Sequence, residues 1–183
     1  STARVVRLFG FEPKVAFVSH STFGQPLTSR TKHIRKAVDI LKEKKVNFEF
    51  DGDMQPDVAL NSEYEELYPF SKIVGKANIL IMPGQHSAAI SYKMLKTLGD
   101  TKVIGPLLIG LGLPVEIAPL RSSTSEILNL ASVAAYSADI IKYDLYNFYS
   151  FCILKSSRSV ILATTSSTST ISFASLITKS FSS

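Results

Sequence analysis

The sequence is poor in several features that define particular classes of protein. It has no tryptophan, one cysteine among 183 residues, and no acidic residue from position 145 to position 183. The single Cys152 cannot form an internal disulfide or build a cysteine zinc site, which is typical of a protein of the reducing cytoplasm. We expect no signal peptide near the start because charged residues interrupt every apolar run there: Arg4, Arg7, Glu12 and Lys14.

The sequence predicts neither a membrane nor a nucleic acid as a partner. The uncharged stretch 160–177 contains nine apolar and nine hydroxyl residues, whereas a spanning helix needs about 20 predominantly apolar ones. The net charge of +5 is a small excess, and the densest basic run, Lys42, Lys44 and Lys45, also contains Glu43. Such a mixed run is typical of a solvated helix face.

The composition divides the chain into two parts. The chain has 45% hydrophobic and 19% charged residues, which excludes the collagen-like, coiled-coil and highly charged disordered classes of protein. Serine and threonine occupy 16 of the last 33 positions, where few residues could pack into a core. We therefore expect the folded domain in residues 1–143 and a Ser/Thr-rich tail of unknown structure, β or disordered, in residues 144–183.

Strand and helix patterns alternate along residues 1–143. Apolar runs predict strands at 15–18, 46–50, 78–82, 103–109 and 113–120, and a turn at 51–53. Residues 1–8 are expected to end a helix closed by Gly10, and 61–68 to form a short acidic helix or turn. This alternation predicts a three-layer α/β sandwich with a mostly parallel sheet.

Three longer helices are expected between and after the strands. Their apolar stripes are predicted to be Ile34, Ala37, Val38 and Leu41 in the first, Ile90, Ser91, Met94, Leu95 and Leu98 in the second, and Ile127, Leu130, Ala131, Ala134 and Ala135 in the third. Ser123 and Glu126 form the Ser-x-x-Glu pattern of a capping box that would open the third helix.

Ligands of parallel sheets bind at the carboxyl ends of the strands, so the expected site loops are 19–25, 51–57, 83–87 and 105–112. The loop 19–24 offers hydroxyls and a glycine but lacks both nucleotide-loop patterns, so a structural turn and a phosphate or carbonyl site both stay open. Asp51, Asp53 and Asp57 do not have calcium-loop spacing, and capping explains Asp51 and Asp57 equally well. We predict no metal site, and only possible acid–base or capping roles for His20 and His86.

Several of these segments together resemble the phosphate acetyl/butyryltransferase family over about residues 1–140. The segments that carry the resemblance are 15–24 (VAFVSHSTFG), 51–60 (DGDMQPDVAL), 77–83 (ANILIMP), 104–111 (IGPLLIGL) and 113–115 (LPV). The amino-acid sequence at 21–24, 67–70 and 86–88 is most similar to the phosphotransacetylase-like C-terminal domain of bacterial NADP-dependent malic enzymes.

The resemblance implies a phosphotransacetylase-like fold of the isocitrate/isopropylmalate dehydrogenase-like architecture, incomplete here because only the latter half of the domain matches. It also implies that malate, NADP and Mg or Mn would bind only in a malic-enzyme catalytic domain, which this chain lacks. The tail matches nothing in the family. A lineage-specific extension and a reading-frame shift both stay open as its origin.

One departure from the family bears on activity. Active phosphotransacetylases of this type carry a Ser-Arg pair shortly before the last helix, and the corresponding positions here are Pro119 and Leu120. Neither side chain can donate a hydrogen bond or supply charge to a developing oxyanion. Arg121 could substitute only if the loop shifted by one residue. We therefore predict no catalytic residue in this chain.

The resemblance favours a regulatory, oligomer-forming domain of a malic enzyme, with acetyl-CoA as effector and the catalytic domain as partner. The pocket for an acyl-CoA or acetyl phosphate-type molecule is predicted to be bordered by Ser21, Thr22, Gly24, Asp51, Gly84, Gly105 and Pro106. Two alternatives stay open: an active phosphate acetyltransferase that moves acetyl between CoA and phosphate, and a stand-alone α/β ligand-binding protein.

Overall fold

A computed structural model describes residues 2–99, 101–109, 111, 113–143, 159–165 and 172–179. In chain order its elements are α1 (Thr2–Leu8), β1 (Lys14–Val18), α2 (Ser29–Glu43), β2 (Glu49–Met54), α3 (Pro56–Leu60), the 3-10 helix η1 (Ser62–Glu65), β3 (Ile79–Ile81), α4 (Gln85–Leu98), β4 (Thr101–Ile109), α5 (Thr124–Tyr143), β5 (Ser159–Thr165) and β6 (Ser172–Lys179). The order of elements confirms the α/β class.

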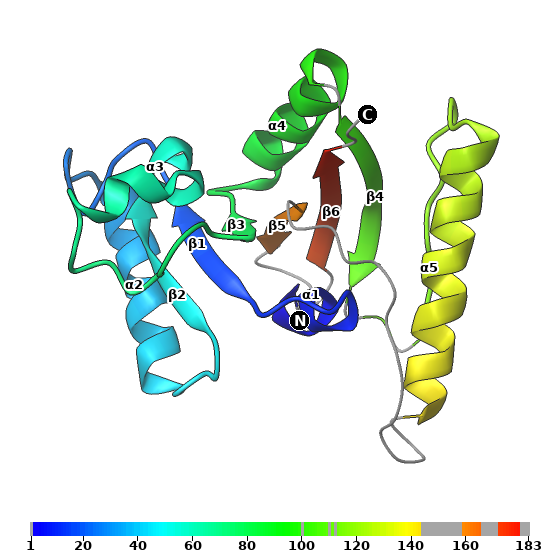
Figure 1. The fold of residues 1–183 in the computed structure, drawn as a ribbon, viewed down its shortest axis with the longest axis horizontal. Coiled ribbons are helices and arrows are strands. Elements are labelled where there is room, and N and C mark those ends of the chain that lie inside the picture. Colours follow the sequence, from blue (N-terminus) through cyan, green and yellow to red (C-terminus); the bar gives the residue numbers. More distant parts are fainter. Residues whose placement is uncertain are drawn as a thin grey trace.

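The six strands form one sheet in the order β2-β1-β3-β5-β6-β4 (Figure 1). β1 pairs in parallel with β2 and β3, and β3 pairs in parallel with β5. β6 is antiparallel to both β5 and β4, so β4 runs in the same direction as β1. The mostly parallel sheet expected from the sequence is therefore confirmed.

The strand β1 is buried on both of its faces. Ala16 and Val18 belong to a core cluster with Met54 and Ala59, while Val15 belongs to a second cluster with Val6 of α1. Successive side chains of a strand point to opposite faces of the sheet, so the two clusters lie on its two sides. Two-sided burial is what a sheet between helical layers requires.

Two strands come from the Ser/Thr-rich tail. β5 and β6 lie between β3 and β4 in the sheet, so the division expected at residue 143 does not separate a folded part from the rest (Figure 1). Ser and Thr are compatible with a strand, and Thr is among the residues that favour it. The expectation of β structure for the tail agrees with these two segments; 144–158, 166–171 and 180–183 lie outside the described residues.

Two local expectations were wrong. The residues Asp51, Gly52 and Asp53 lie inside β2, not in a turn after it. Residues 113–120 form no strand and contribute only an isolated bridge between Leu107 and Glu116. Pro114 and Pro119 lack the amide hydrogen that a strand ladder needs, which is a physical reason for this difference.

The helices match their predicted positions better than their predicted faces. In α2 Val38 is buried and its three stripe partners are partly buried, as expected. In α4 the predicted stripe is mostly exposed, with Leu98 at 80%, and Ala88 is the buried residue. In α5 Leu130 is buried and Ala134 is partly buried, as expected, but the predicted Ile127, Ala131 and Ala135 are exposed. Val133 and Ser137, outside the predicted stripe, are partly buried.

Among the described residues, none of the helices combines the length and the hydropathy that crossing a bilayer demands.

Candidate functional site

An irregularity of β2 shapes the carboxyl end of β1. Phe17 is paired with Gly52 but Val18 is paired with Met54, so Asp53 is an extra residue in the ladder. Gly52 has φ +153°, and a Cβ added there would lie 2.6 Å from the Phe17 Cβ. Only glycine fits this position, and the resulting bulge re-aims the Asp53 side chain.

Asp53 is fully buried and holds the loop that follows β1. Its carboxylate accepts hydrogen bonds from the Ser21 hydroxyl, from the Gly24 amide at 3.3 Å and from Arg35 Nε at 3.1 Å. We call Asp53, Ser21, Gly24 and Arg35 the Asp53 network. Because a buried charge needs hydrogen-bonding partners, this network fixes the loop 19–25 against β2 and α2.

Further hydrogen bonds fasten the same loop. Thr22 Oγ1 accepts the Gln55 amide at 3.3 Å, and the Gln55 side chain donates to the His20 carbonyl at 2.9 Å. Asp51 lies two residues before Asp53 in β2, and its carboxylate accepts hydrogen bonds from the amides of Gly52 at 2.9 Å and Lys72 at 2.8 Å. The polar groups of this region are therefore engaged with one another, and the part of the chain that the structure describes contains no cluster of three His, Cys, Asp or Glu side chains suited to a metal ion.

The structure brings together three of the seven predicted pocket residues. Ser21, Thr22 and Gly24 lie in the loop after β1, where Ser21 and Gly24 are buried and Thr22 is partly buried, while Asp51 is buried in β2 and contacts Lys72 instead. Gly84 precedes α4 at the carboxyl end of the neighbouring β3, and no atom lies within 4 Å of a Cβ added there. Gly105 and Pro106 lie inside β4, which β5 and β6 separate from β3. They do not adjoin the loop 19–25.

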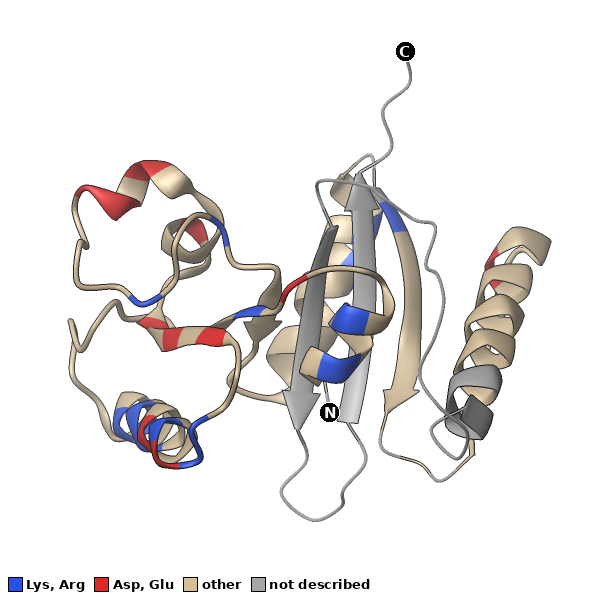
Figure 2. Cartoon of the chain, turned by 60° about the horizontal axis from the view of Figure 1, so that its bottom comes forward, with Lys and Arg blue, Asp and Glu red and all other residues tan. Residues whose placement is uncertain are grey.

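Sequence reasoning did not identify the partnership of Asp53 and Arg35. Arg35 lies outside the apolar stripe predicted for α2 and its side chain is 45% exposed, but its Nε reaches the buried carboxylate. Figure 2 shows that basic residues gather on α2 and acidic residues on the adjacent β2. This charge complementarity between consecutive elements is the signal that could have indicated the pair.

The segment before α5 is exposed at the two positions that bear on catalysis. Leu120 is fully exposed, Pro119 is exposed, and the Ser122 amide donates to the Pro119 carbonyl at 3.0 Å, which closes a turn. The capping box is confirmed: the Glu126 carboxylate accepts the Ser123 amide at 2.8 Å and the Glu126 amide donates to Ser123 Oγ at 3.3 Å. Glu126 thus has a structural role at the start of α5.

An ion pair connects α5 to α4. Lys96 of α4 donates to Glu126, and the hydrogen bonds from Lys96 and Ser123 lower the pKa of Glu126 to about 2. The same carboxylate therefore caps one helix and contacts another.

Comparison with known proteins shows which family has this sequence and fold. Residues 1–135 match the family model described as phosphate acetyl/butaryl transferase. The chain is 48% identical over 136 residues to the NADP-dependent malic enzyme of Rhizobium meliloti, covering 74% of this chain and 18% of that protein. It is 35% identical over 138 residues to the phosphate acetyltransferase of Bacillus subtilis, covering 75% of this chain and 43% of that protein.

Solved structures agree with the sequence relatives. A phosphotransacetylase from Streptococcus pyogenes superposes with a TM-score of 0.71 at 33% identity, covering 76% of this chain and 43% of that one. The EutD phosphotransacetylase from Staphylococcus aureus gives a TM-score of 0.68 at 31% identity. The chain spans less than half the length of each of these relatives. On this evidence, the chain belongs to the phosphate acetyl/butaryl transferase family and contains part of its domain.

Proposed function

We propose that this chain is a non-catalytic, regulatory part of an NADP-dependent malic enzyme and that it binds acetyl-CoA. The observation that carries the proposal is the exposed Pro119–Leu120 turn, where the resemblance to active phosphotransacetylases calls for serine and arginine. An apolar side chain and a proline cannot stabilise charge on an acyl phosphate or a tetrahedral oxyanion. With proline and leucine at these positions, we expect the chain to bind a ligand without transferring its acyl group.

The degree of similarity supports a malic-enzyme parent. The identity is 48% with the malic enzyme of Rhizobium meliloti and 35% with the phosphate acetyltransferase of Bacillus subtilis, over stretches of similar length. In such a parent, oxidation and decarboxylation of malate with NADP and Mg or Mn would take place in a region that this chain does not span. For the metal ion, the described residues offer no cluster of three His, Cys, Asp or Glu side chains.

The loop 19–25 supports the choice of an acyl-CoA ligand. It lies at the carboxyl end of a parallel sheet, where such folds bind ligands. Arg35 places its guanidinium next to Gly24 and keeps 45% of its side chain exposed, so it could pair with a phosphate of CoA. Thr22, Gly24 and Gly84 would border the ligand, and the buried Ser21 would hold the loop through Asp53. The buried Asp51 would hold the segment at Lys72.

Calorimetry tests the ligand. We expect acetyl-CoA to bind the full-length parent enzyme and to lose affinity at least about tenfold in a Gly24→Trp variant, which displaces the Arg35 guanidinium because a Cβ added at Gly24 would lie 2.7 Å from its Nη2. Gly84→Trp is a second blocking variant in open space, and Asn129→Trp on the exposed face of α5 is the control. An absence of binding, or equal binding by all four proteins, would remove the proposal.

A coupled assay distinguishes the alternative function. An active phosphate acetyltransferase would form acetyl-CoA from acetyl phosphate and CoA, whereas we expect no turnover above the uncatalysed rate. Measurable turnover that disappears in Arg121→Ala would instead show that Arg121 replaces the missing arginine and that the chain is catalytic.

We also propose that this part of the parent forms a homo-oligomer through the exposed apolar face of α4. Ile90, Met94 and Leu98 are each more than half exposed there, and Ile127 and Leu128 of α5 are exposed as well. Exposed apolar patches of this kind mark contact surfaces. Light scattering should show a smaller assembly for Met94→Glu; an unchanged mass would exclude this face. We further propose a cytoplasmic location, consistent with the single cysteine.

A further inference from the structure

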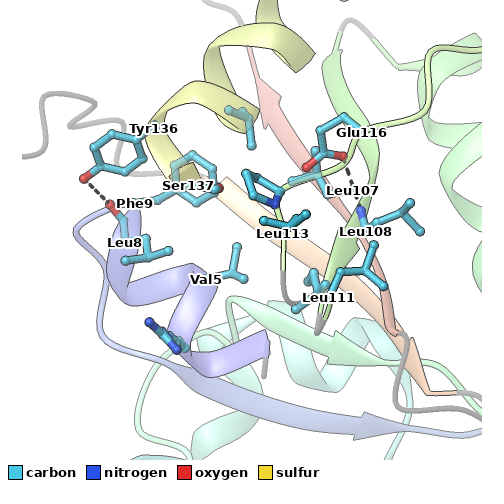
Figure 3. Close-up of a pocket in the computed structure, with 14 residues that line it drawn as sticks. Val5, Leu8, Phe9, Leu107, Leu108, Leu111, Leu113, Glu116, Tyr136 and Ser137 are labelled. Atoms are coloured by element: carbon cyan, nitrogen blue, oxygen red, sulfur yellow. Dashed lines mark hydrogen bonds between the residues drawn. The ribbon is translucent and has the colours of Figure 1, made fainter. Parts of the chain in front are cut away.

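A cavity of about 220 Å³ lies between α1, β4 and α5 (Figure 3). Its remaining wall is formed by residues from the segment between β4 and α5: Leu111, Leu113, Pro114 and Glu116. The side chains that line it are mostly apolar and include Val5, Leu8, Phe9, Leu107, Leu113 and Val133. This cavity shares no residue with the predicted acyl-CoA pocket.

The frame of the cavity is held by contacts between distant parts of the chain. The Tyr136 hydroxyl of α5 donates to the Leu8 carbonyl at the end of α1, at 3.3 Å (Figure 3). Leu107 and Ile109 are buried in β4, and Leu130 is buried in α5 one turn before Val133. A hydrogen bond thus joins α1 to α5 at the edge of the cavity, and buried residues of β4 and α5 lie beside it, while the cavity between these elements stays open.

One carboxylate lies in this apolar wall. Glu116 Oε2 accepts the Leu108 amide at 3.3 Å, and within the described part of the chain Oε1 has no hydrogen-bond partner. Burial raises the pKa of Glu116, and the hydrogen bond from Leu108 opposes that rise. Arg4, the other charged side chain lining the cavity, already has a partner of its own. Glu116 therefore offers a free acceptor to a molecule in the cavity.

We propose that this cavity binds a small apolar molecule that carries one hydrogen-bond donor, an arylalkyl amine or alcohol, with its apolar body between α1 and α5 and its donor on Glu116. The volume sets the size. A cavity of about 150 Å³ is known to hold benzene, so a cavity of 220 Å³ suits a ligand of about nine non-hydrogen atoms. Such a molecule is far smaller than an acyl-CoA.

Titration of the 183-residue chain followed by NMR tests the site. We expect phenethylamine to shift the resonances of Val5, Leu113 and Val133 with a dissociation constant on the order of 0.1 to 1 mM. Phenethyl alcohol should bind the same residues, and ethylbenzene, which has no donor, should bind at least about fivefold more weakly. No shift of these residues at millimolar phenethylamine would overturn the proposal.

Two pairs of variants show whether the residues act as proposed. Val133→Phe should fill the cavity and weaken binding at least about tenfold, whereas Ala135→Phe, on the exposed side of α5, should leave it unchanged. Glu116→Gln should weaken phenethylamine but not ethylbenzene, with the exposed Glu66→Gln as its control. Equal binding by Val133→Phe and Ala135→Phe would contradict the proposal; if Val133→Phe does not fold, the selective effect of Glu116→Gln decides. None of these results depends on acetyl-CoA binding.

Discussion

The two halves of the molecule use polarity in opposite ways. Around β1, β2 and α2, charges are dense and engaged with one another, and Asp53 is fully buried with three donors around it. Around α4 and α5, charges are sparse, apolar side chains are exposed, and a cavity separates α5 from α1 (Figure 2). The first half is fixed by specific hydrogen bonds, whereas the second has surface and volume left for partners.

This difference concerns the contacts on which stability depends. Polar groups that are satisfied internally hold a loop in one conformation, and in the Asp53 network Arg35 still keeps 45% of its side chain exposed for a ligand. Apolar surface that is not covered has no such internal partner. Substitutions of buried, hydrogen-bonded groups in the first half should therefore change stability, and substitutions in the second should change stability only where packing is complete.

The largest effect is expected at Gly52. Gly52→Ala places a methyl group 2.6 Å from the Phe17 Cβ at a φ that side chains rarely adopt, and should lower the free energy of unfolding by about 4 kcal/mol. Gly84→Ala, where a Cβ meets nothing, should change it by less than about 1 kcal/mol. Urea unfolding followed by circular dichroism measures both, and equal effects would mean that the bulge does not determine the fold of this half.

The next largest effect is expected at Asp53. Asp53→Ala leaves the Ser21 hydroxyl and the Gly24 amide buried without their acceptor and should cost about 3 kcal/mol. Asp39→Ala removes a carboxylate that pairs with Lys42 on the surface of α2 at 2.7 Å and should leave the unfolding midpoint unchanged. A comparable loss of stability in both variants would show that the buried Asp53 stabilises the fold no more than the exposed Asp39 does.

Within the apolar half, packing should decide the outcome. Leu130→Ala removes a side chain that is 5% exposed and should cost about 2.5 kcal/mol. Leu98→Ala removes the same atoms from a position that is 80% exposed and should cost less than about 0.5 kcal/mol. Thermal unfolding of the two variants tests this contrast; a large loss for Leu98→Ala in the isolated chain would show that α4 is covered in solution.

The smallest effect is expected from acid. The pKa of Glu126 is lowered to about 2 in the folded chain, so its contribution to stability is present above its ordinary value of 4.5 and is lost as the pH falls toward 2. The difference in unfolding midpoint between the wild type and Glu126→Gln should therefore shrink between pH 5 and pH 2.5. A difference that is constant over this range would mean that the charge of Glu126 does not stabilise α5.

Periodicity and motif spacing were sufficient for the alternation of helices and strands from α1 to β4, the parallel sheet and the capping box, but they predicted a strand at 113–120 that does not form and did not locate β5 and β6. They failed on the faces of α4 and α5, because apolar residues occur on more than one side of these helices and only tertiary contacts select the buried one. The loop 19–25 could be predicted as a feature at the edge of the sheet. The Asp53 network could not, because it depends on a one-residue bulge that no local propensity indicates. The pocket residues Gly105 and Pro106 were grouped with that loop because 105–112 was expected to be a loop at the carboxyl end of a strand, whereas both residues lie inside β4.

The place of β6 bears on how the chain folds as it is made. β1 pairs with β2 and β3 within the first 81 residues, whereas Thr101 of β4 pairs with Lys179 of β6. On the ribosome, β4 would thus wait for 78 more residues before its hydrogen-bonding groups are satisfied. During that interval the growing chain presents an unpaired strand, which is the situation in which chaperones and premature association compete.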